Sequence, residues 1–435
     1  MNTTEICRKI RSRDLYTRYG RIDQIVGLTV EATGPSCNIG DVCIISAEDS
    51  KKTMTAEVVG FRGNKVLLMP YGDMSGIGYG STVRNTGRQL QVPVGPDLIG
   101  RTVDAMANPI DGGPPIKGEA YYQINGSPSN PLSRPSIKNP IQLGIKAIDG
   151  LITIGKGQRM GIFAGSGVGK STLMGSIARN VKADVNVIAL VGERGREVVD
   201  FIDNSLGREG LKRSVLVVAT SDQPAMMRSK CALTATAIAE YFRDQGKDVL
   251  LMMDSLTRYC MALREIGLSV GEPPVARGYT PSIYSDLPKL LERAGNFEMG
   301  SITGLYTVLV EGDDSNEPIS DTVRSIIDGH IMLSRKLATQ NHYPAIDVLA
   351  SISRLMSEIA GKEHKNLAGR LRSLLALYNA NEDLISIGAY KSGTNRELDT
   401  AIACKRKIDQ FLMQTVGENF SIDETLRLMA EAIAS

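Results

Sequence analysis

The stretch AGSGVGKST, residues 164–172, decides the fold class of this chain. It follows the apolar run MGIFA (160–164) and precedes LMGSIARN, which can form a helix. A glycine-rich turn between a buried strand and a helix is the setting in which backbone N–H groups surround phosphate oxygens. The sequence therefore predicts a phosphate-binding loop at the carboxyl end of a strand.

This loop contains the groups that a nucleotide site needs. Lys170 is expected to reach the β- and γ-phosphates of ATP, and the Ser171 hydroxyl to bind Mg²⁺. The strict motif has glycine where this chain has Ala164, which weakens the bare pattern, and a glycine-rich turn without a ligand is the alternative. The predicted nucleotide-binding residues of the loop are Ala164, Gly165, Ser166, Gly167, Val168, Gly169, Lys170, Ser171 and Thr172.

Outside the loop, buried apolar runs alternate with helical patterns such as 225–245. This alternation predicts an α/β core, with a mainly parallel sheet covered by helices on both faces. The further apolar runs are VNVIALV (185–191), SVLVVAT (214–220), VLLMM (249–253) and LYTVLV (305–310).

The flanking regions have different patterns. Short strand-like runs broken by turn signals predict a small β-barrel in the N-terminal part. Past residue 357 amphipathic helices are expected at 363–378, 397–414 and 421–434, the last with Ser421 and Glu424 at capping-box spacing. We therefore expect a domain order of 1–19 N-terminal segment, 20–92 β-barrel, 93–139 connecting region with irregular turns, 140–356 α/β core with the phosphate-binding loop and 357–435 C-terminal helical domain.

Composition limits the partners and the compartment. Lys plus Arg number 50 against 48 for Asp plus Glu, so bulk attraction to nucleic acid or to an anionic membrane is not expected. The six cysteines include no CxxC pair, and we expect reduced thiols in a cytoplasmic protein. No signal peptide and no apolar run of roughly 20 residues is present, so membrane contact is expected only through partners.

Two carboxylates are candidates for the chemistry. Glu193, in GERGREV directly after the run 185–191, is expected to orient the attacking water, with Arg194 beside it as a second catalytic candidate. The alternative is that the local acids only pair with local arginines. Asp254 ends the run VLLMMD and is expected to hold Mg²⁺ through water, although such a residue is often only a helix N-cap. Arg258, one turn further, faces either the phosphates or the solvent.

The segment HYPAIDVLASISRLM (342–356) distinguishes between related families, because its core, 344–353, fits a signature of the rotary ATP synthase α/β superfamily. Nearly the whole chain resembles that superfamily, and specifically the ATPases of flagellar protein export and their type III secretion counterparts. The further motifs are AGSGVGKS, GERGREV, MDSLTRYCMALRE (253–265), GEPPVARGYTPSIYSDLPKLLERAG (271–295), EGDDSNEPISD (311–321) and DGHIMLSR (328–335).

The resemblance implies site residues that spacing alone does not give. It implies that 140–356 is a RecA-like ATPase core. It also implies a homohexamer in which Glu193 is the catalytic glutamate and Arg354 enters the neighbouring subunit's site. It also implies that Tyr343 stacks on adenine. Without the resemblance, Arg354 would be assigned to a surface salt bridge and Tyr343 to loop packing. For loops that face the ring's pore, it suggests 292–295 and the acidic stretch 311–317, with solvated loops as the alternative.

The partners also follow from the resemblance. They are a peripheral-stalk regulator, a central-stalk protein, export-gate membrane proteins and chaperone–substrate complexes, at the inner face of the membrane. The segment before Gly20 is either the docking segment for a regulator or a disordered leader.

Several functions share this core. The first is an ATPase that energises flagellar protein export, favoured over its injectisome counterpart by IGAYKSGTNRELDTAI (387–402). An ion-translocating synthase subunit is disfavoured by the export-type motifs, and a noncatalytic nucleotide-binding scaffold by Glu193. A nucleic-acid translocase would need stacking aromatics in basic surroundings, but between Gly20 and Pro93 the aromatics are Phe61, Tyr71 and Tyr79, none in a basic cluster. We therefore expect no nucleic-acid partner.

Overall fold

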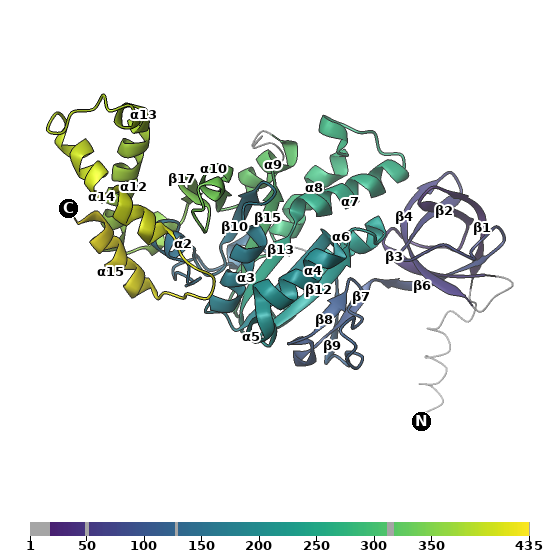
Figure 1. Cartoon of the computed structure of the whole chain (residues 1–435). Coiled ribbons are helices and arrows are strands. Elements are labelled where there is room, and N and C mark those ends of the chain that lie inside the picture. The colour runs from purple at the N-terminus through teal and green to yellow at the C-terminus, as the bar shows by residue number, and fades with distance from the viewer. Residues whose placement is uncertain (1–17, 48–51, 127–128, 311–316, 435) are drawn as a thin grey trace. The chain divides into compact units, whose positions relative to one another are not determined.

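The computed structural model describes residues 18–47, 52–126, 129–310 and 317–434, drawn as ribbon in Figure 1. Most of the segment 1–19 and of the acidic stretch 311–317 therefore lies outside the described residues. The described residues form two compact units. The first contains residues up to Gln91 with 223–227 and 262–281, and the second contains 92–222, 228–261 and 282–435.

The first unit contains a closed antiparallel barrel whose described strands follow the order β1-β2-β5-β4-β3-β6. Pairing of β1 with β6 closes the barrel. Buried and half-buried side chains alternate along β3, so Cys43 and Ile45 point into the barrel core with Val30 and Val83. The predicted β-barrel is confirmed. Its strands are β1 (Tyr19–Val26), β2 (Thr29–Thr33), β3 (Asp41–Ser46), β4 (Thr53–Arg62), β5 (Lys65–Pro70) and β6 (Thr82–Gln89).

The second unit is built on a mainly parallel sheet with the order β17-β16-β10-β15-β13-β11-β12-β8, and β14 pairs with β15. The pairs β16–β17 and β14–β15 are antiparallel, and the others are parallel. Every apolar run predicted as a strand forms one, so the predicted α/β class is confirmed. The strands are β8 (Thr102–Asp104), β10 (Arg159–Ala164), β11 (Val185–Glu193), β12 (Ser214–Thr220), β13 (Asp248–Asp254), β14 (Gly295–Asn296), β15 (Ser301–Leu309), β16 (Gly329–Leu333) and β17 (Ile346–Ser353).

Helices connect these strands, and the helix predicted over 225–245 spans Ala225–Asp244. No helix in the described ranges is both long and apolar enough to cross a lipid bilayer. The helices before the C-terminal region are α2 (Lys146–Leu151), α3 (Lys170–Asn180), α4 (Gly195–Asp200), the π-helical η3 (Phe201–Leu206), α5 (Gly207–Leu211), α6 (Ala225–Asp244), α7 (Leu256–Ser269), α8 (Pro281–Leu291), α9 (Pro318–Ile326) and α10 (Arg335–Thr339), with short 3-10 turns η1 (Pro96–Leu98), η2 (Pro131–Ser133) and η4 (Ala276–Gly278).

The region 93–139 differs from the expected irregular connection. It contains β8, which pairs in parallel with β12 and so extends the core sheet. It also contains β9 (Ala120–Gln123), which pairs with β7 (Gln91–Val94). Strands this short, among Pro and Gly, show no periodicity that would predict them from the sequence. They form because a strand far away in the sequence pairs with them.

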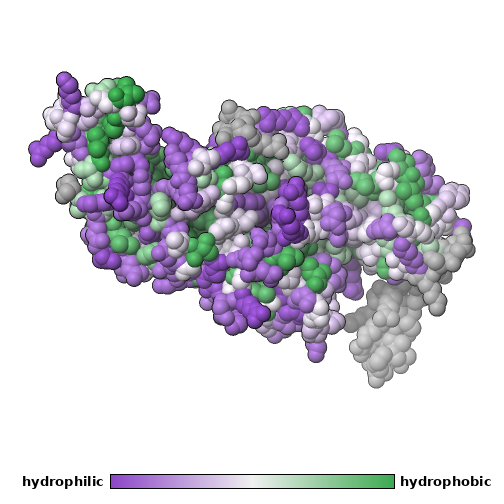
Figure 2. All heavy atoms as spheres, in the orientation of Figure 1, coloured by the Kyte–Doolittle hydropathy of each residue, from purple (hydrophilic) through white to green (hydrophobic). Residues whose placement is uncertain are grey.

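The C-terminal helices α12, α14 and α15 pack on one another, and α15 also packs on α2. The predicted capping box at Ser421 and Glu424 is confirmed, with both reciprocal hydrogen bonds present. Figure 2 shows hydrophobic residues at the place where Figure 1 labels α13, where Leu384 is 49% and Ile387 74% exposed. These helices are α11 (Met356–Ile359), α12 (Lys362–Ala380), α13 (Glu382–Ser386), α14 (Arg396–Leu412) and α15 (Ile422–Ile433).

Candidate active site

The glycine-rich loop joins β10 to α3, and β10 lies between β15 and β16 in the sheet. Gly169 precedes the helix in the left-handed conformation, with φ at 85°. Within the described residues no side chain caps this helix, so its first N–H groups point toward the loop. Lys170 and Ser171 occupy the first turn of α3. A ring of N–H groups at a helix N-terminus favours a bound anion.

Two acidic residues end neighbouring strands beside this loop. Glu193 is the last residue of β11 and Asp254 the last of β13, and only 7% and 3% of their surfaces are exposed. The Lys170 ammonium donates a hydrogen bond to Asp254 Oδ1, and its Nζ lies 3.7 Å from Glu193 Oε1. The hydroxyl of Thr307 donates a 2.7 Å hydrogen bond to the same Asp254 oxygen. The structure therefore brings together the lysine and both carboxylates that the sequence selected.

The electrostatics of Glu193 depend on its burial. Burial, the nearby negative charge of Asp254 and a side-chain hydrogen bond with Glu197 raise the pKa of Glu193, while Lys170 and Arg258 lower it, and the net result is a pKa of about 7. The same hydrogen bond lowers the pKa of Glu197. A carboxylate that titrates near neutrality is suited to accept a hydrogen bond from a reacting water.

A cavity of about 580 Å³ surrounds the phosphate-binding loop. Three of its lining residues have no definite role predicted from the sequence. Arg258 donates from Nε to Glu193 Oε1 at 3.3 Å, and Glu197 and Arg335 line the wall. Glu197 lies in the motif GERGREV and Arg335 in the motif DGHIMLSR. Membership in these motifs is the only sequence feature that points to a role for either residue.

Arg194 lies at the rim of this cavity. Its side chain is 77% exposed and its guanidinium lies 3.6 Å from Glu197. The backbone of Arg194 caps α4. The structure therefore places Arg194 near the loop, with its charge directed mainly to solvent and to Glu197.

A second cavity, of about 530 Å³, adjoins the loop and shares Gly169 and Thr172 with the first. Tyr343 lines it, and a Cβ on Gly169 would lie 3.4 Å from the Tyr343 ring. The segment 413–416 lines the same cavity, and Gln414 N donates a 2.9 Å hydrogen bond to the Tyr343 carbonyl. The helix predicted over 397–414 ends at Leu412 in the structure, so 413–414 lie outside it, and no sequence pattern indicates 413–416 as part of a site.

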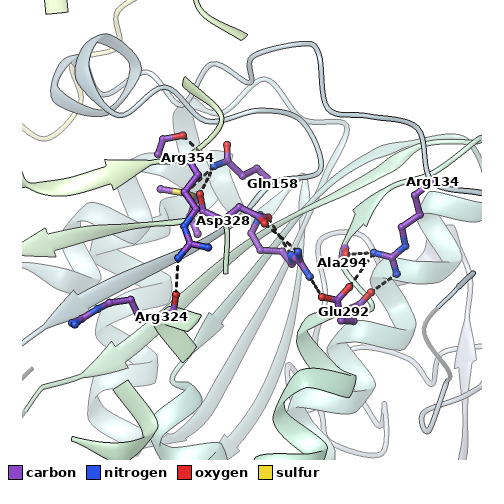
Figure 3. Close-up of polar contacts among 10 residues, drawn as sticks. Arg134, Gln158, Glu292, Ala294, Arg324, Asp328 and Arg354 are labelled. Atoms are coloured by element: carbon purple, nitrogen blue, oxygen red, sulfur yellow. Dashed lines mark hydrogen bonds and ion pairs between the residues drawn. The ribbon is translucent and has the colours of Figure 1, made fainter. Parts of the chain in front are cut away.

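Arg354 lines neither cavity. It is exposed and directly follows β17, the edge strand of the sheet. Its backbone N–H donates to the Asp328 carbonyl at 3.0 Å, and its Nη2 donates to the Arg324 carbonyl at 3.3 Å, as Figure 3 shows. The structure therefore does not bring Arg354 to the phosphate-binding loop of its own chain.

The expected pore-facing segment 292–295 is held by ion pairs. The Glu292 carboxylate contacts the guanidinium of Arg159, and Arg134 donates to the Glu292 and Ala294 carbonyls (Figure 3). Gly295 begins β14. This segment is therefore anchored to the sheet, not a freely solvated loop.

The residues fit a magnesium ion held mainly by substrate. Among the described residues there is no group of three His, Cys, Asp or Glu side chains that would hold a metal by itself. Mg²⁺ in nucleotide sites takes one or two protein oxygens together with phosphates and waters. The Ser171 hydroxyl at the first turn of α3 and the buried Asp254 carboxylate are oxygen donors of this kind.

Comparisons with known proteins identify the family. Models match for the ATP synthase alpha/beta family β-barrel domain at 22–87, its nucleotide-binding domain at 144–353, and the T3SS EscN ATPase C-terminal domain at 360–431. A flagellum-specific ATP synthase from Bacillus subtilis is 55% identical over 427 residues, covering 98% of each chain. The chain belongs to the family of flagellum-specific and type III secretion ATPases.

Other members of this ATPase family are nearly as similar. A type 3 secretion system ATPase from Xanthomonas euvesicatoria is 48% identical, covering 98% of this chain and 96% of the relative. The assembled ATPase EscN from enteropathogenic E. coli superposes with a TM-score of 0.89 at 45% identity, covering 95% of this chain and 100% of EscN. The predicted family, and with it the prediction of an ATPase, is confirmed.

Proposed function

We propose that this ATPase hydrolyses Mg-ATP to energise the export of flagellar proteins through a type III secretion apparatus. The observation that carries the chemistry is the convergence of Lys170, Glu193 and Asp254 beside the helix N-terminus at the phosphate-binding loop. The 55% identity to a flagellum-specific ATP synthase supports the biological role.

Each residue of the site has a separate role in binding or hydrolysis. The backbone N–H groups of 165–169 and the Lys170 ammonium hold the phosphates, and Ser171 and, through water, Asp254 hold Mg²⁺. When bound, Mg²⁺ neutralises charge on the phosphate oxygens. Glu193 accepts a hydrogen bond from the attacking water and so orients it toward the γ-phosphate, which suffices for a loose transition state. Arg194 adds positive charge at the rim, and Tyr343 stacks on adenine.

Arg354 acts on the site of a neighbouring copy in a homohexamer. Its guanidinium stabilises the charge on the transferring phosphoryl group. Support comes from its position at the edge strand, where Leu349 and Ile352 are also 36% and 47% exposed. Exposed apolar side chains on a sheet edge are suited to a subunit contact. The assembled form of EscN is a further reason to propose a ring.

The partners of this ATPase are proposed from its membership of the family. EscN has been solved in complex with its central stalk EscO, and we assign a central-stalk partner to this ATPase as well. A peripheral-stalk regulator, export-gate membrane proteins and chaperone–substrate complexes complete the set. The site of action is the cytoplasmic face of the membrane, reached through these partners, and no nucleic acid is involved.

A role as the ATPase of an injectisome is the second candidate function, and the 48% identity to the Xanthomonas type 3 secretion system ATPase supports it. Expression in a Bacillus subtilis strain that lacks its own flagellum-specific ATP synthase separates the two roles. A flagellar ATPase restores flagellin secretion and swimming, and the Glu193→Gln variant does not. Absence of rescue by a well-expressed, active ATPase argues for the injectisome.

The chemistry is tested on the purified chain. Phosphate release from ATP is measured with Mg²⁺ and with excess EDTA, for wild type, Lys170→Ala and Glu193→Gln. We expect hydrolysis only with Mg²⁺, weak nucleotide binding in Lys170→Ala, and tight binding without turnover in Glu193→Gln. Turnover by Glu193→Gln at the wild-type rate would contradict the assigned role of Glu193.

A further inference from the structure

Asp328 lies at a junction between two parts of the core. It follows the end of α9 and directly precedes β16. Its backbone carbonyl accepts hydrogen bonds from Arg354 N at 3.0 Å and from Gln158 Nε2 at 3.1 Å. Because Gln158 is fully buried, this carbonyl is fixed from the inside of the protein while it holds the backbone of an exposed arginine.

The side chain of Asp328 is held by Arg159, the first residue of β10. Arg159 donates three hydrogen bonds to this carboxylate, from its backbone N at 3.0 Å, from Nε at 3.1 Å and from Nη2 at 3.1 Å. In return, Asp328 N donates to the Arg159 carbonyl at 2.9 Å. A fork of this kind fixes orientation as well as distance.

Both anchors of Arg354 lie on the short segment 324–328. The backbone anchor is the Asp328 carbonyl, and the guanidinium anchor is the Arg324 carbonyl at 3.3 Å. The Arg159 fork holds Asp328 at one end of this segment, and the Arg324 carbonyl lies at the other end, in the last turn of α9. Figure 3 shows the contacts of Arg354 with Asp328 and Arg324. Arg159 also forms an ion pair with Glu292, which in turn pairs with Arg134.

We propose that the Arg159–Asp328 pair is a positioning element for Arg354, braced on its far side by Glu292. The inference rests on the proposed function of Arg354 in a neighbouring subunit's site. Arg159 and Asp328 touch no substrate in this account. They hold the segment 324–328, to which the backbone and the guanidinium of Arg354 are hydrogen-bonded. A displacement of about 1 Å in such a group lowers the rate about 10²-fold.

Mixed-subunit assays give a test that a merely structural role would not pass. In a mixture with Glu193→Gln, any variant whose defect lies in its donated arginine should regain activity, because the Glu193→Gln subunit supplies an intact Arg354. In a mixture with Arg354→Ala the same variant should stay inactive, because neither subunit donates a well-placed arginine. A variant with a damaged phosphate-binding loop should show the opposite pattern.

The variants are Asp328→Asn and Arg159→Lys, with Asp423→Asn as the control, since Asp423 is an exposed carboxylate in the first turn of α15. For the first two we expect kcat to fall about 10- to 100-fold with KM for ATP nearly unchanged. We expect each to recover above the mean of the two pure rates with Glu193→Gln and not with Arg354→Ala. Asp423→Asn should behave as wild type.

The outcomes are separable. If Glu193→Gln and Arg354→Ala do not complement each other, the proposed shared site fails. If they do, three results would overturn the positioning role: wild-type turnover by Asp328→Asn and Arg159→Lys, no complementation of either with Glu193→Gln, or complementation with Arg354→Ala. Thermal unfolding of each variant identifies a folding defect. If one of Asp328→Asn and Arg159→Lys is misfolded, the other, folded variant tests the positioning role.

Discussion

The Nε of Arg258 donates a 3.3 Å hydrogen bond to Oε1 of Glu193, so a residue of α7 directly contacts the acid at the end of β11. Arg258 and Lys170 both place positive charge on one face of Glu193, while Asp254 and burial act in the other direction. The protonation of Glu193 near neutrality is therefore decided by a small number of neighbours. This balance makes the pH dependence of hydrolysis a sensitive readout of the site.

We expect kcat to rise with pH through about 7, because Glu193 can orient water only as the carboxylate and its pKa is raised to about 7 by burial. In Arg258→Ala the loss of a stabilising cation raises that pKa further, so the rising limb moves to higher pH. Arg258→Lys keeps the charge and should move it less. The measurement is kcat between pH 5.5 and 9, and an unchanged profile in Arg258→Ala would refute this assignment.

Tyr343 should contribute to ATP affinity through its ring. Base–aromatic stacking is worth about 1–3 kcal/mol, so Tyr343→Ala should raise KM for ATP about 5- to 150-fold with a smaller effect on kcat. Tyr343→Phe keeps the ring and serves as the matched control. Equal KM values for Tyr343→Ala and Tyr343→Phe would show that the ring does not contact the base.

The C-terminal helical region should also contribute to nucleotide binding. Val416 lines the Tyr343 cavity and is 60% exposed, so Val416→Asp should leave folding intact while placing negative charge beside the nucleotide. We expect a higher KM for ATP. Leu384→Asp is the control, because Leu384 is an apolar residue of α13 with similar exposure that does not line the cavity. A KM effect of the same size in both variants would argue against a role for 413–416.

The stability of the core should depend strongly on one buried ion pair. Arg293 donates to both oxygens of Glu240 at 2.8 and 2.7 Å, with side-chain exposures of 2% and 11%. Arg293→Ala leaves Glu240 buried without this partner and should lower the free energy of unfolding by about 3–5 kcal/mol.

Chemical denaturation measures this effect. The control is Arg427→Ala, which breaks the exposed pair with Glu431 and should cost about 0.3–0.5 kcal/mol. Similar losses in the two variants would contradict the argument from burial.

Much of the core was predictable, because its signals are local. The strands of the parallel sheet are continuous apolar runs, and the phosphate-binding loop has fixed glycines between a strand and a helix. Glu193 and Asp254 each end such a run, and parallel strands bring their carboxyl ends to one edge of the sheet. Their convergence on Lys170 therefore followed from the order of elements.

The parts of the fold and of the site that could not be predicted depend on contacts between segments that are distant in the sequence. Strand β8 exists because β12 offers it a parallel edge, and no periodicity in 102–104 indicates this. The segment 413–416 reaches the Tyr343 cavity only through tertiary packing of the C-terminal helices. The Arg159–Asp328 fork likewise joins residues 169 positions apart, so neither residue appeared among the sequence candidates.

Mixing Glu193→Gln with Arg354→Ala at fixed total concentration tests the shared site most directly, with the mixing ratio as the variable. Each pure variant should be nearly inactive. If the site combines Glu193 of one subunit with Arg354 of its neighbour, activity should pass through a maximum at equal mixing, at about a quarter of the wild-type rate for random assembly of a closed ring. No activity at any ratio, in mixtures shown to exchange subunits, would contradict a site built from two subunits.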